Sequence, residues 1–236
     1  MSMLTRTVSV VTLAALCGSA TLSAQVQEDD FQWYIGPQAG YMMFETQLQT
    51  LGGIFMVGAH TLIKARRTGL MISLEQGFGS NELSSFEDAS APAVACNGLT
   101  PGVRCVRFDR LLRASAVLMA FPFKSHFQPF LGAGFGIQNA HSPRPVVSAA
   151  EGLTPAQVDN LRDAASSAGS YGFGTLLGGV QVRVGRKLVV YGQGQLISGP
   201  GRGKLFTGAG YTLEGGLRWS IGSSKESLTG TGIQSQ

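Results

Sequence analysis

The chain has 236 residues, of which 44% are hydrophobic and only 14% are charged, and it contains 33 glycines. This composition excludes a disordered or collagen-like chain, and no apolar run reaches the roughly 20 residues that a membrane helix needs. The formal net charge of +4 is spread along the sequence without a basic run, which argues against nucleic-acid binding. A chain rich in apolar residues and glycine but poor in charge favours alternating strands that face lipid.

The N-terminus has the features of a secretory signal. Arg6 precedes an apolar stretch at residues 8–16, and small residues ending at Ala24 offer a cleavage site. The apolar stretch is too short to span a bilayer. We therefore predict a signal peptide over residues 1–24, in preference to a buried N-terminal helix, and an exported mature protein from which Cys17 has been removed.

Between residues 31 and 222, eight segments alternate between two faces of different character. In the last segment, Leu213 and Leu217 share an apolar face, whereas Glu214 and Arg218 lie on the opposite face. A water-soluble barrel would need many lysines and glutamates on its polar face, but here that face consists mostly of Gly, Ser and Gln. The predicted strands are residues 32–44, 53–65, 69–79, 107–123, 129–138, 172–184, 188–198 and 204–221.

We predict that the apolar face meets lipid and that the polar face lines a narrow lumen. An arginine at the bilayer midplane costs about 2–4 kcal/mol, and the apolar face carries only Arg110, near a strand end. Buried charges must pair, so Glu75 or Glu214 is expected to bridge to Arg113 or Arg218, as a rigidifying network or, alternatively, as a gate for small ions. The predicted lumen charges are His60, Lys64, Glu75, Asp109, Arg113, Arg183, Glu214 and Arg218.

The connections between the strands alternate in length. Short polar turns at residues 66–69, 124–128 and 185–187 alternate with longer connections, the longest at residues 80–106 and 139–171. This predicts an all-β fold, an eight-stranded antiparallel transmembrane up-and-down β-barrel with short periplasmic turns and longer extracellular loops. Aromatic residues beside the short turns and the N-terminus predict an interfacial girdle, with ordinary core packing as the alternative. This girdle comprises Phe31, Trp33, Phe121, Phe123, Phe127 and Trp219, and a second aromatic set near the long loops comprises Phe44, Phe55, Phe78, Phe108 and Phe206.

The long connections carry two local signals. Cys96 and Cys105 are an even pair in an exported chain, so we predict a disulfide that stabilises its loop by roughly 2–3 kcal/mol. Thr154 and Gln157, in the order Thr-Pro-Ala-Gln, form the N-terminal signature of a helix that we expect to run to about Ser166. The predicted organisation is a signal peptide (1–24), a barrel domain (25–222) and a flexible C-terminal tail (223–236).

Two glycine-rich stretches carry a family resemblance. Residues 128–136 read Gln-Pro-Phe-Leu-Gly-Ala-Gly-Phe-Gly, and residues 214–221 read Glu-Gly-Gly-Leu-Arg-Trp-Ser-Ile. With these the chain resembles bacterial outer-membrane β-barrel domain proteins, including the OmpA transmembrane domain and the OmpX/Ail group. The resemblance implies an outer-membrane barrel in contact with lipid and lipopolysaccharide. It also implies insertion by the outer-membrane assembly machinery, with Leu217, Trp219 and Ile221 as apolar positions of the final-strand signal.

No pattern in the sequence predicts a cofactor, a metal or a catalytic centre. The glycine-rich stretches lack the following helix and Lys-Ser/Thr of a phosphate loop. A lipid A deacylase would need a Ser–His–acid set, but His60 is expected to point inward, His126 lies in a turn, and His141 has no carboxylate at an evident spacing. We therefore predict a non-catalytic structural or surface-interaction protein acting through its extracellular loops. The alternatives are a small-solute or ion pore of porin type and, less favoured, a lipid A-modifying enzyme.

Overall fold

The computed structural model describes residues 31–48, 51–96, 101–123, 125–185, 187–201 and 203–224. The predicted signal peptide therefore lies outside the described residues, as does most of the predicted tail. The last strand, β9, ends at Ser224, so the barrel continues two residues beyond its predicted boundary.

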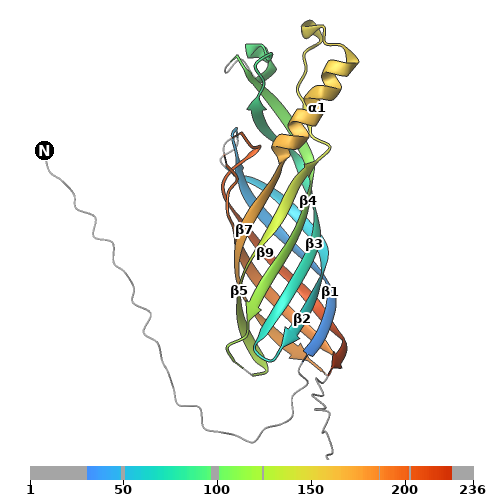
Figure 1. Cartoon of the computed structure of the whole chain (residues 1–236), viewed down its shortest axis with the longest axis vertical. Helices are drawn as coiled ribbons and strands as arrows, with labels where there is room; N and C mark the ends of the chain where they lie inside the picture. Colours follow the sequence, from blue (N-terminus) through green and yellow to red (C-terminus); the bar gives the residue numbers. More distant parts are fainter. Residues whose placement is uncertain are drawn as a thin grey trace, which may run out of the picture.

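Eight antiparallel strands close into one tall barrel (Figure 1). Each barrel strand pairs with its neighbours in the chain, and the first strand closes the barrel against the last. A two-residue strand, β6, lies outside this order and pairs with one end of β4. The strands are β1 (Phe31–Thr46), β2 (Gly52–Ala65), β3 (Thr68–Glu87), β4 (Val103–Ala120), β5 (Phe127–His141), β6 (Arg144–Pro145), β7 (Ser170–Val184), β8 (Leu188–Ile197) and β9 (Phe206–Ser224). All eight predicted strands and the up-and-down order are confirmed.

The β3–β4 hairpin is longer than its sequence pattern predicts. β3 continues to Glu87 and β4 already begins at Val103, so the pairing extends well beyond the barrel wall. The register of this pair shifts between Phe78 and Glu82, where Asn81 adopts a positive φ of 65°. Because this irregularity interrupts the alternation of faces, the sequence beyond it looks like a loop.

The two faces of the barrel wall have the predicted orientation. Leu213 and Leu217 are 70% and 43% exposed, whereas Glu214 and Arg218 are 3% and 0% exposed. Exposed large hydrophobic side chains lie on all eight barrel strands, so an apolar surface surrounds the barrel, as an environment of lipid requires. Among the described residues, no helix is both long enough and apolar enough to cross a membrane.

The interior is more apolar than the prediction of a polar lumen implies. Buried hydrophobic side chains form two clusters separated by the polar groups of the barrel centre. The turn-side cluster comprises Tyr34, Leu62, Met71, Val117, Met119, Phe121, Phe130, Leu177, Val189 and Tyr191. The loop-side cluster comprises Met42, Phe44, Ile54, Met56, Phe86, Val106, Phe108, Leu111, Ala140, Ala165, Ala168, Phe173, Ile197, Leu205 and Phe206.

Glycines inside the barrel make room for these large side chains. A Cβ atom at Gly136 would lie 2.4 Å from Cζ of Phe173, and one at Gly179 would lie 2.6 Å from Cζ of Phe130. Both distances are far below van der Waals contact, so the phenyl rings occupy the space that a larger residue would need. The glycine-rich strands are therefore a requirement of interior packing.

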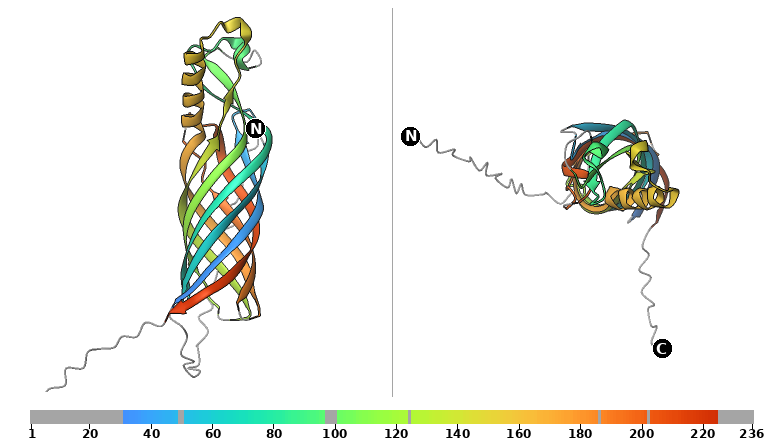
Figure 2. Two further views of the ribbon diagram at one scale, coloured as in Figure 1. Left: turned by 90° about the vertical axis from the view of Figure 1, so that its right-hand side faces the viewer. Right: turned by 90° about the horizontal axis from the view of Figure 1, so that it is seen from above.

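A structured projection stands on the loop side of the barrel (Figure 2). We use this name for the described parts of residues 82–108 and 142–169. The projection contains the end of the β3–β4 hairpin, strand β6, two short 3-10 helices, η1 (Ala93–Cys96) and η2 (Ala149–Glu151), and α1 (Pro155–Gly169).

Helix α1 begins where the sequence predicts and ends three residues later. Thr154 caps its N-terminus, and the capping box with Gln157 is complete. Ala165 and Ala168 are buried in the loop-side cluster, against which Leu161 also packs. The hydrophobic core of the projection is therefore continuous with that of the barrel.

Candidate functional site

The centre of the barrel holds an arginine bound to two glutamates. Arg113 contacts Glu75 at 2.6 Å and also pairs with Glu214, and its third nitrogen donates to the hydroxyl of Thr212 at 2.9 Å. The second oxygen of Glu214 accepts hydrogen bonds from amides on the neighbouring strand, Gln193 at 2.8 Å and Gln195 at 2.7 Å. These contacts join β3, β4, β8 and β9, so they cross-brace the barrel as a rigid layer.

A second buried arginine, Arg218, lies nearer the turn side and has aromatic rather than acidic neighbours. Its guanidinium is 3.9 Å from the ring centroid of Tyr191, a cation–π distance, and it also bonds to the side-chain oxygen of Gln181. Its Nε donates to Nε2 of His60 at 3.3 Å. The Tyr191 hydroxyl lies 3.3 Å from Nδ1 of His60 and donates to Gln38 at 2.9 Å.

This geometry gives His60 a defined role in the interior. A ring nitrogen that accepts from Arg218 cannot itself carry a proton, so the proton belongs on Nδ1, facing the Tyr191 oxygen. The imidazole is buried and its two nitrogens are engaged. His60 therefore serves to hold Arg218 and Tyr191 in place.

Three of the predicted lumen residues belong neither to the Arg113 group nor to the Arg218 group, namely Lys64, Arg183 and Asp109. Lys64 is buried, donates to Gln128 at 3.0 Å and lies 4.6 Å from the centroid of the Phe121 ring. Arg183 is exposed at the turn end. The placement of Asp109 in the lumen is wrong: its side chain is 41% exposed and pairs with Arg144 at 2.9 Å. The inward–outward alternation of side chains in β4 is interrupted beside Asp109, since Phe108 and Leu111 are both buried.

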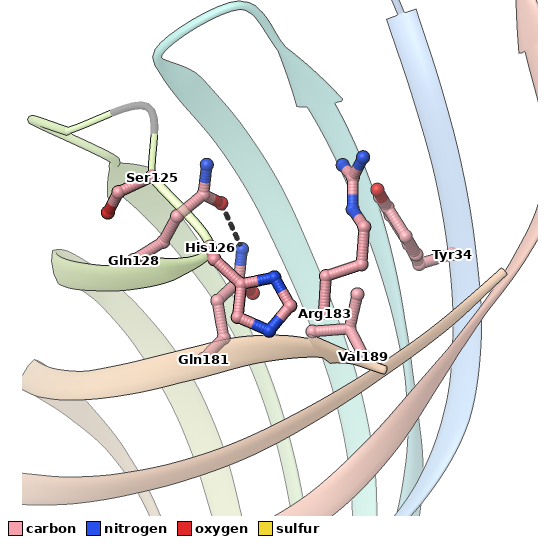
Figure 3. Close-up of a pocket in the computed structure, with 7 residues that line it drawn as sticks. All are labelled: Tyr34, Ser125, His126, Gln128, Gln181, Arg183 and Val189. Carbon is pink, nitrogen blue, oxygen red and sulfur yellow. Dashed lines mark hydrogen bonds between the residues drawn. The ribbon is translucent and has the colours of Figure 1, made fainter. Parts of the chain in front are cut away.

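A polar pocket of about 310 Å³ opens at the turn end of the barrel (Figure 3). Gln181 donates to Gln128 at 2.8 Å within it, and Gln181 is in turn bonded to Arg218. Beyond these amides the turn-side cluster fills the interior. The pocket is therefore a vestibule that ends inside the barrel. Its lining residues are Tyr34, Ser125, His126, Gln128, Gln181, Arg183 and Val189.

The predicted aromatic residues divide between the outer surface and the interior. Trp33, Phe123, Phe127 and Trp219 have exposed fractions of 41%, 60%, 55% and 53%, and Phe31 is half-buried. Phe121 is only 1% exposed and packs in the turn-side cluster, so its assignment to the girdle is wrong. In the second aromatic set, near the long loops, Phe55 and Phe78 face outward. The rings of Phe44, Phe108 and Phe206 lie inside the barrel.

The projection has its own arginine-centred network, which no pattern in the sequence predicts. Arg104 is fully buried and contacts Asp88 at 2.6 Å and Glu151 at 2.8 Å, and it also donates to the carbonyl of Val146 at 2.9 Å. These partners belong to two different long connections. The predicted disulfide, Cys96–Cys105, is present beside it and is confirmed.

Charges in this network shift one another's ionisation. Burial raises the pKa of Asp88, but hydrogen bonds from Ser90 and Arg104 outweigh it, and the pKa is lowered. The hydrogen bond from Arg104 is the main cause of a lowered pKa at Glu151. Burial acts to lower the pKa of Arg104, but its bonds to the two carboxylates prevail and raise it. The three groups therefore hold one another in their charged forms.

The side chains most often used for metal binding and acid–base chemistry lie apart from one another in the described residues. Among them, no three His, Cys, Asp or Glu side chains are grouped in a way that could hold a metal ion. The histidines are dispersed: His60 is buried in the interior, His126 lines the turn-end vestibule, and His141 is exposed at the end of β5.

Comparisons with known proteins agree with this fold. No protein-family model matches the sequence, and no curated protein matches it. Among solved structures, Neisserial surface protein A (NspA) matches with a TM-score of 0.52 and 12% identity, covering 80% of this chain and 97% of NspA. Ail, the attachment invasion locus protein of Yersinia pestis, matches with a TM-score of 0.38 and 10% identity, over 83% of this chain and 100% of Ail.

The closed eight-stranded barrel and its match to NspA define the class. The chain has the fold of the small eight-stranded outer-membrane β-barrels. The resemblance that the glycine-rich strands indicate is therefore confirmed at the level of the fold.

Proposed function

We propose that this chain is a non-catalytic outer-membrane protein that displays its projection at the cell surface for interaction with other molecules. Export through the N-terminal signal at residues 1–24 and insertion through the final strand, with Trp219 and Ile221 on its outer face, belong to this proposal. So does contact of the apolar wall with lipid and lipopolysaccharide.

The filled interior is the observation that carries the proposal. From loop side to turn side, a section through the barrel passes the loop-side apolar cluster, the Arg113 layer, and the turn-side apolar cluster, whose ring of Tyr191 contacts Arg218. On the loop side, the rings of Phe44 and Phe108 lie 5.4 Å each from the ring of Phe206. An eight-stranded barrel is only wide enough for its own side chains, which supports a structural role for the barrel and an active role for the projection.

The construction of the projection supports a surface role. Its core merges with the loop-side cluster, and Arg104 and the Cys96–Cys105 disulfide tie its segments together. The C-terminal end of α1 is also held, because Lys204 donates to the Ser167 carbonyl at 2.8 Å. A preorganised surface loses little conformational entropy on binding, which suits a recognition element.

The turn-end vestibule favours a small pore as the second candidate. It is polar, and the exposed Arg183 lines it. Planar-bilayer recordings separate the two functions, with a general porin as the positive control. We expect no steady conductance from the purified barrel, whereas a steady, large conductance would establish the pore instead.

Orientation and location are tested by epitope insertion. One tag is placed after Gly152, in the projection, and a matched tag after Gly185, in a short turn; both glycines have positive φ and open space around them. We expect antibody to reach the first tag on intact cells and the second only after permeabilisation. The reverse pattern, or recovery of the protein in the soluble fraction, would overturn the proposal.

A further inference from the structure

A pocket of about 390 Å³ lies on the outer wall of the barrel, at the foot of the projection. Strand β5 lies in the middle of this pocket, between β4 on one side and the start of β7 on the other. The lining residues are Leu112 and Ala114 of β4, Ile137, Gln138 and Asn139 of β5, and Ser170 and Tyr171 of β7. Ile137 and Leu112 are exposed on the apolar wall. The pocket therefore opens onto the surface that the proposed function assigns to lipid.

Basic residues follow directly above this pocket along the same strands. Residues that face each other across neighbouring strands lie side by side, so the register of β4 with β5 and β6 fixes the order. From the barrel toward the projection, the paired positions are Ala114 with Ile137, Leu112 with Asn139, Arg110 with His141, and Arg107 with Arg144. The outer wall thus changes from apolar to cationic within a few residues.

The basic group carries an excess of positive charge. Arg107, Arg110 and Arg144 are all exposed, and Asp109 pairs with Arg144. Three guanidinium groups and one carboxylate leave a net charge of +2. Exposed arginines at the edge of an apolar wall provide bidentate donors for an anionic phosphate.

We propose that this face binds one lipopolysaccharide molecule of the outer leaflet, with an acyl chain in the pocket and a lipid A phosphate on Arg107 and Arg110. The order of the site, apolar below and cationic above, matches the order of chain and phosphorylated headgroup in such a lipid. The inference rests on the proposed membrane location and orientation. It adds a specific lipid site on one side of the barrel.

The test measures binding of purified lipid A and, separately, of phosphatidylglycerol to the full chain in detergent by native mass spectrometry. The variant R107Q/R110Q removes two cations from the site, and A114F fills the pocket. The matched control R67Q/R162Q removes two exposed arginines that lie at a short turn and on α1. Heat-modifiable migration of every variant verifies that the barrel has formed.

We expect R107Q/R110Q to weaken lipid A binding by about tenfold or more, A114F to weaken it as well, and the control to stay within about twofold of the unmodified chain. Equal losses in R107Q/R110Q and in the control would overturn the proposal, because they would reveal only a general charge effect. Equal affinity for phosphatidylglycerol would overturn the assignment to lipopolysaccharide. The planar-bilayer conductance and the antibody access to the inserted tags are measured independently of lipid binding. Failure of the lipid site would therefore leave the proposed function standing.

Discussion

In the part of the chain that the structure describes, two arginines each bind two carboxylates, one in the barrel and one in the projection. Arg113 and its partners Glu75 and Glu214 are buried, with side chains at most 1% exposed. In the projection, Arg104 is equally buried, but the carboxylates of Asp88 and Glu151 are 10% and 7% exposed. An arginine bound to two carboxylates is thus enclosed in the barrel, whereas the equivalent group in the projection lies near solvent.

The two groups are also assembled differently. Glu75 lies directly opposite Arg113 in the β3–β4 ladder, so the sheet register alone brings them together. Asp88 and Glu151 belong to separate connections, and only the path of those connections around Arg104 brings them together. The central group therefore depends on the barrel, whereas the projection depends on the Arg104 group for its own order.

The largest effect is expected from R113L. This change leaves two buried glutamates without their cation, and breaking a buried ion pair in this way costs about 3–5 kcal/mol. The measurement is the free energy of unfolding in urea, with the barrel in lipid vesicles and tryptophan fluorescence as the signal.

The matched control is the triple variant E75Q/R113M/E214Q, which removes all three charges together. Replacing a complete buried ion group is often close to neutral, so most of the lost stability should return. If the triple variant is as unstable as R113L, packing rather than charge determines the stability of this layer.

A smaller and more local effect is expected from R104L. Hydrogen bonds to charged groups contribute about 1.5–3 kcal/mol, and here they link two connections outside the barrel wall. Hydrogen exchange should rise in the described parts of the projection, while exchange in β7, β8 and β9 stays unchanged. The control R162L removes an exposed arginine of α1 whose partner, Asp159, is also exposed, and should alter neither region. An equal rise throughout the barrel would show that the projection and barrel unfold as one unit.

The sequence predicts the barrel because period-two alternation is a local property of each strand. Glu214 and Arg218 are enclosed and Leu213 faces outward because the side-chain direction repeats every second residue. The error at Phe121 has the same basis: it shares the inward parity of Arg113, and grouping aromatics by their position along the chain ignored this parity.

Features that depend on breaks in the alternation could not be predicted. Asp109 faces outward because the strand slips beside it, opposite the irregularity near Asn81 in β3, and no residue pattern in β4 marks that slip. The Arg104 group joins Asp88 and Glu151 across sequence separations of 16 and 47 residues, without a periodic element to relate them. The disulfide could be predicted because two of the three cysteines, Cys96 and Cys105, lie outside the predicted signal peptide.

The smallest effect is expected from mild acid and concerns the projection alone. Asp88 and Glu151 have lowered pKa values when folded, compared with ordinary values of 3.8 and 4.5. The stability they provide is therefore fully present above pH 4.5 and is lost as the pH falls through their folded values. Hydroxyl-radical footprinting from pH 7 to pH 3 should reveal rising access to residues of the projection. In R104L this pH dependence should become weaker, because the variant lacks the main cause of the lowered pKa at Glu151, while the hydrogen bonds from Ser90 still act on Asp88. If unmodified chain and variant respond alike, the carboxylates are stabilised by something other than Arg104.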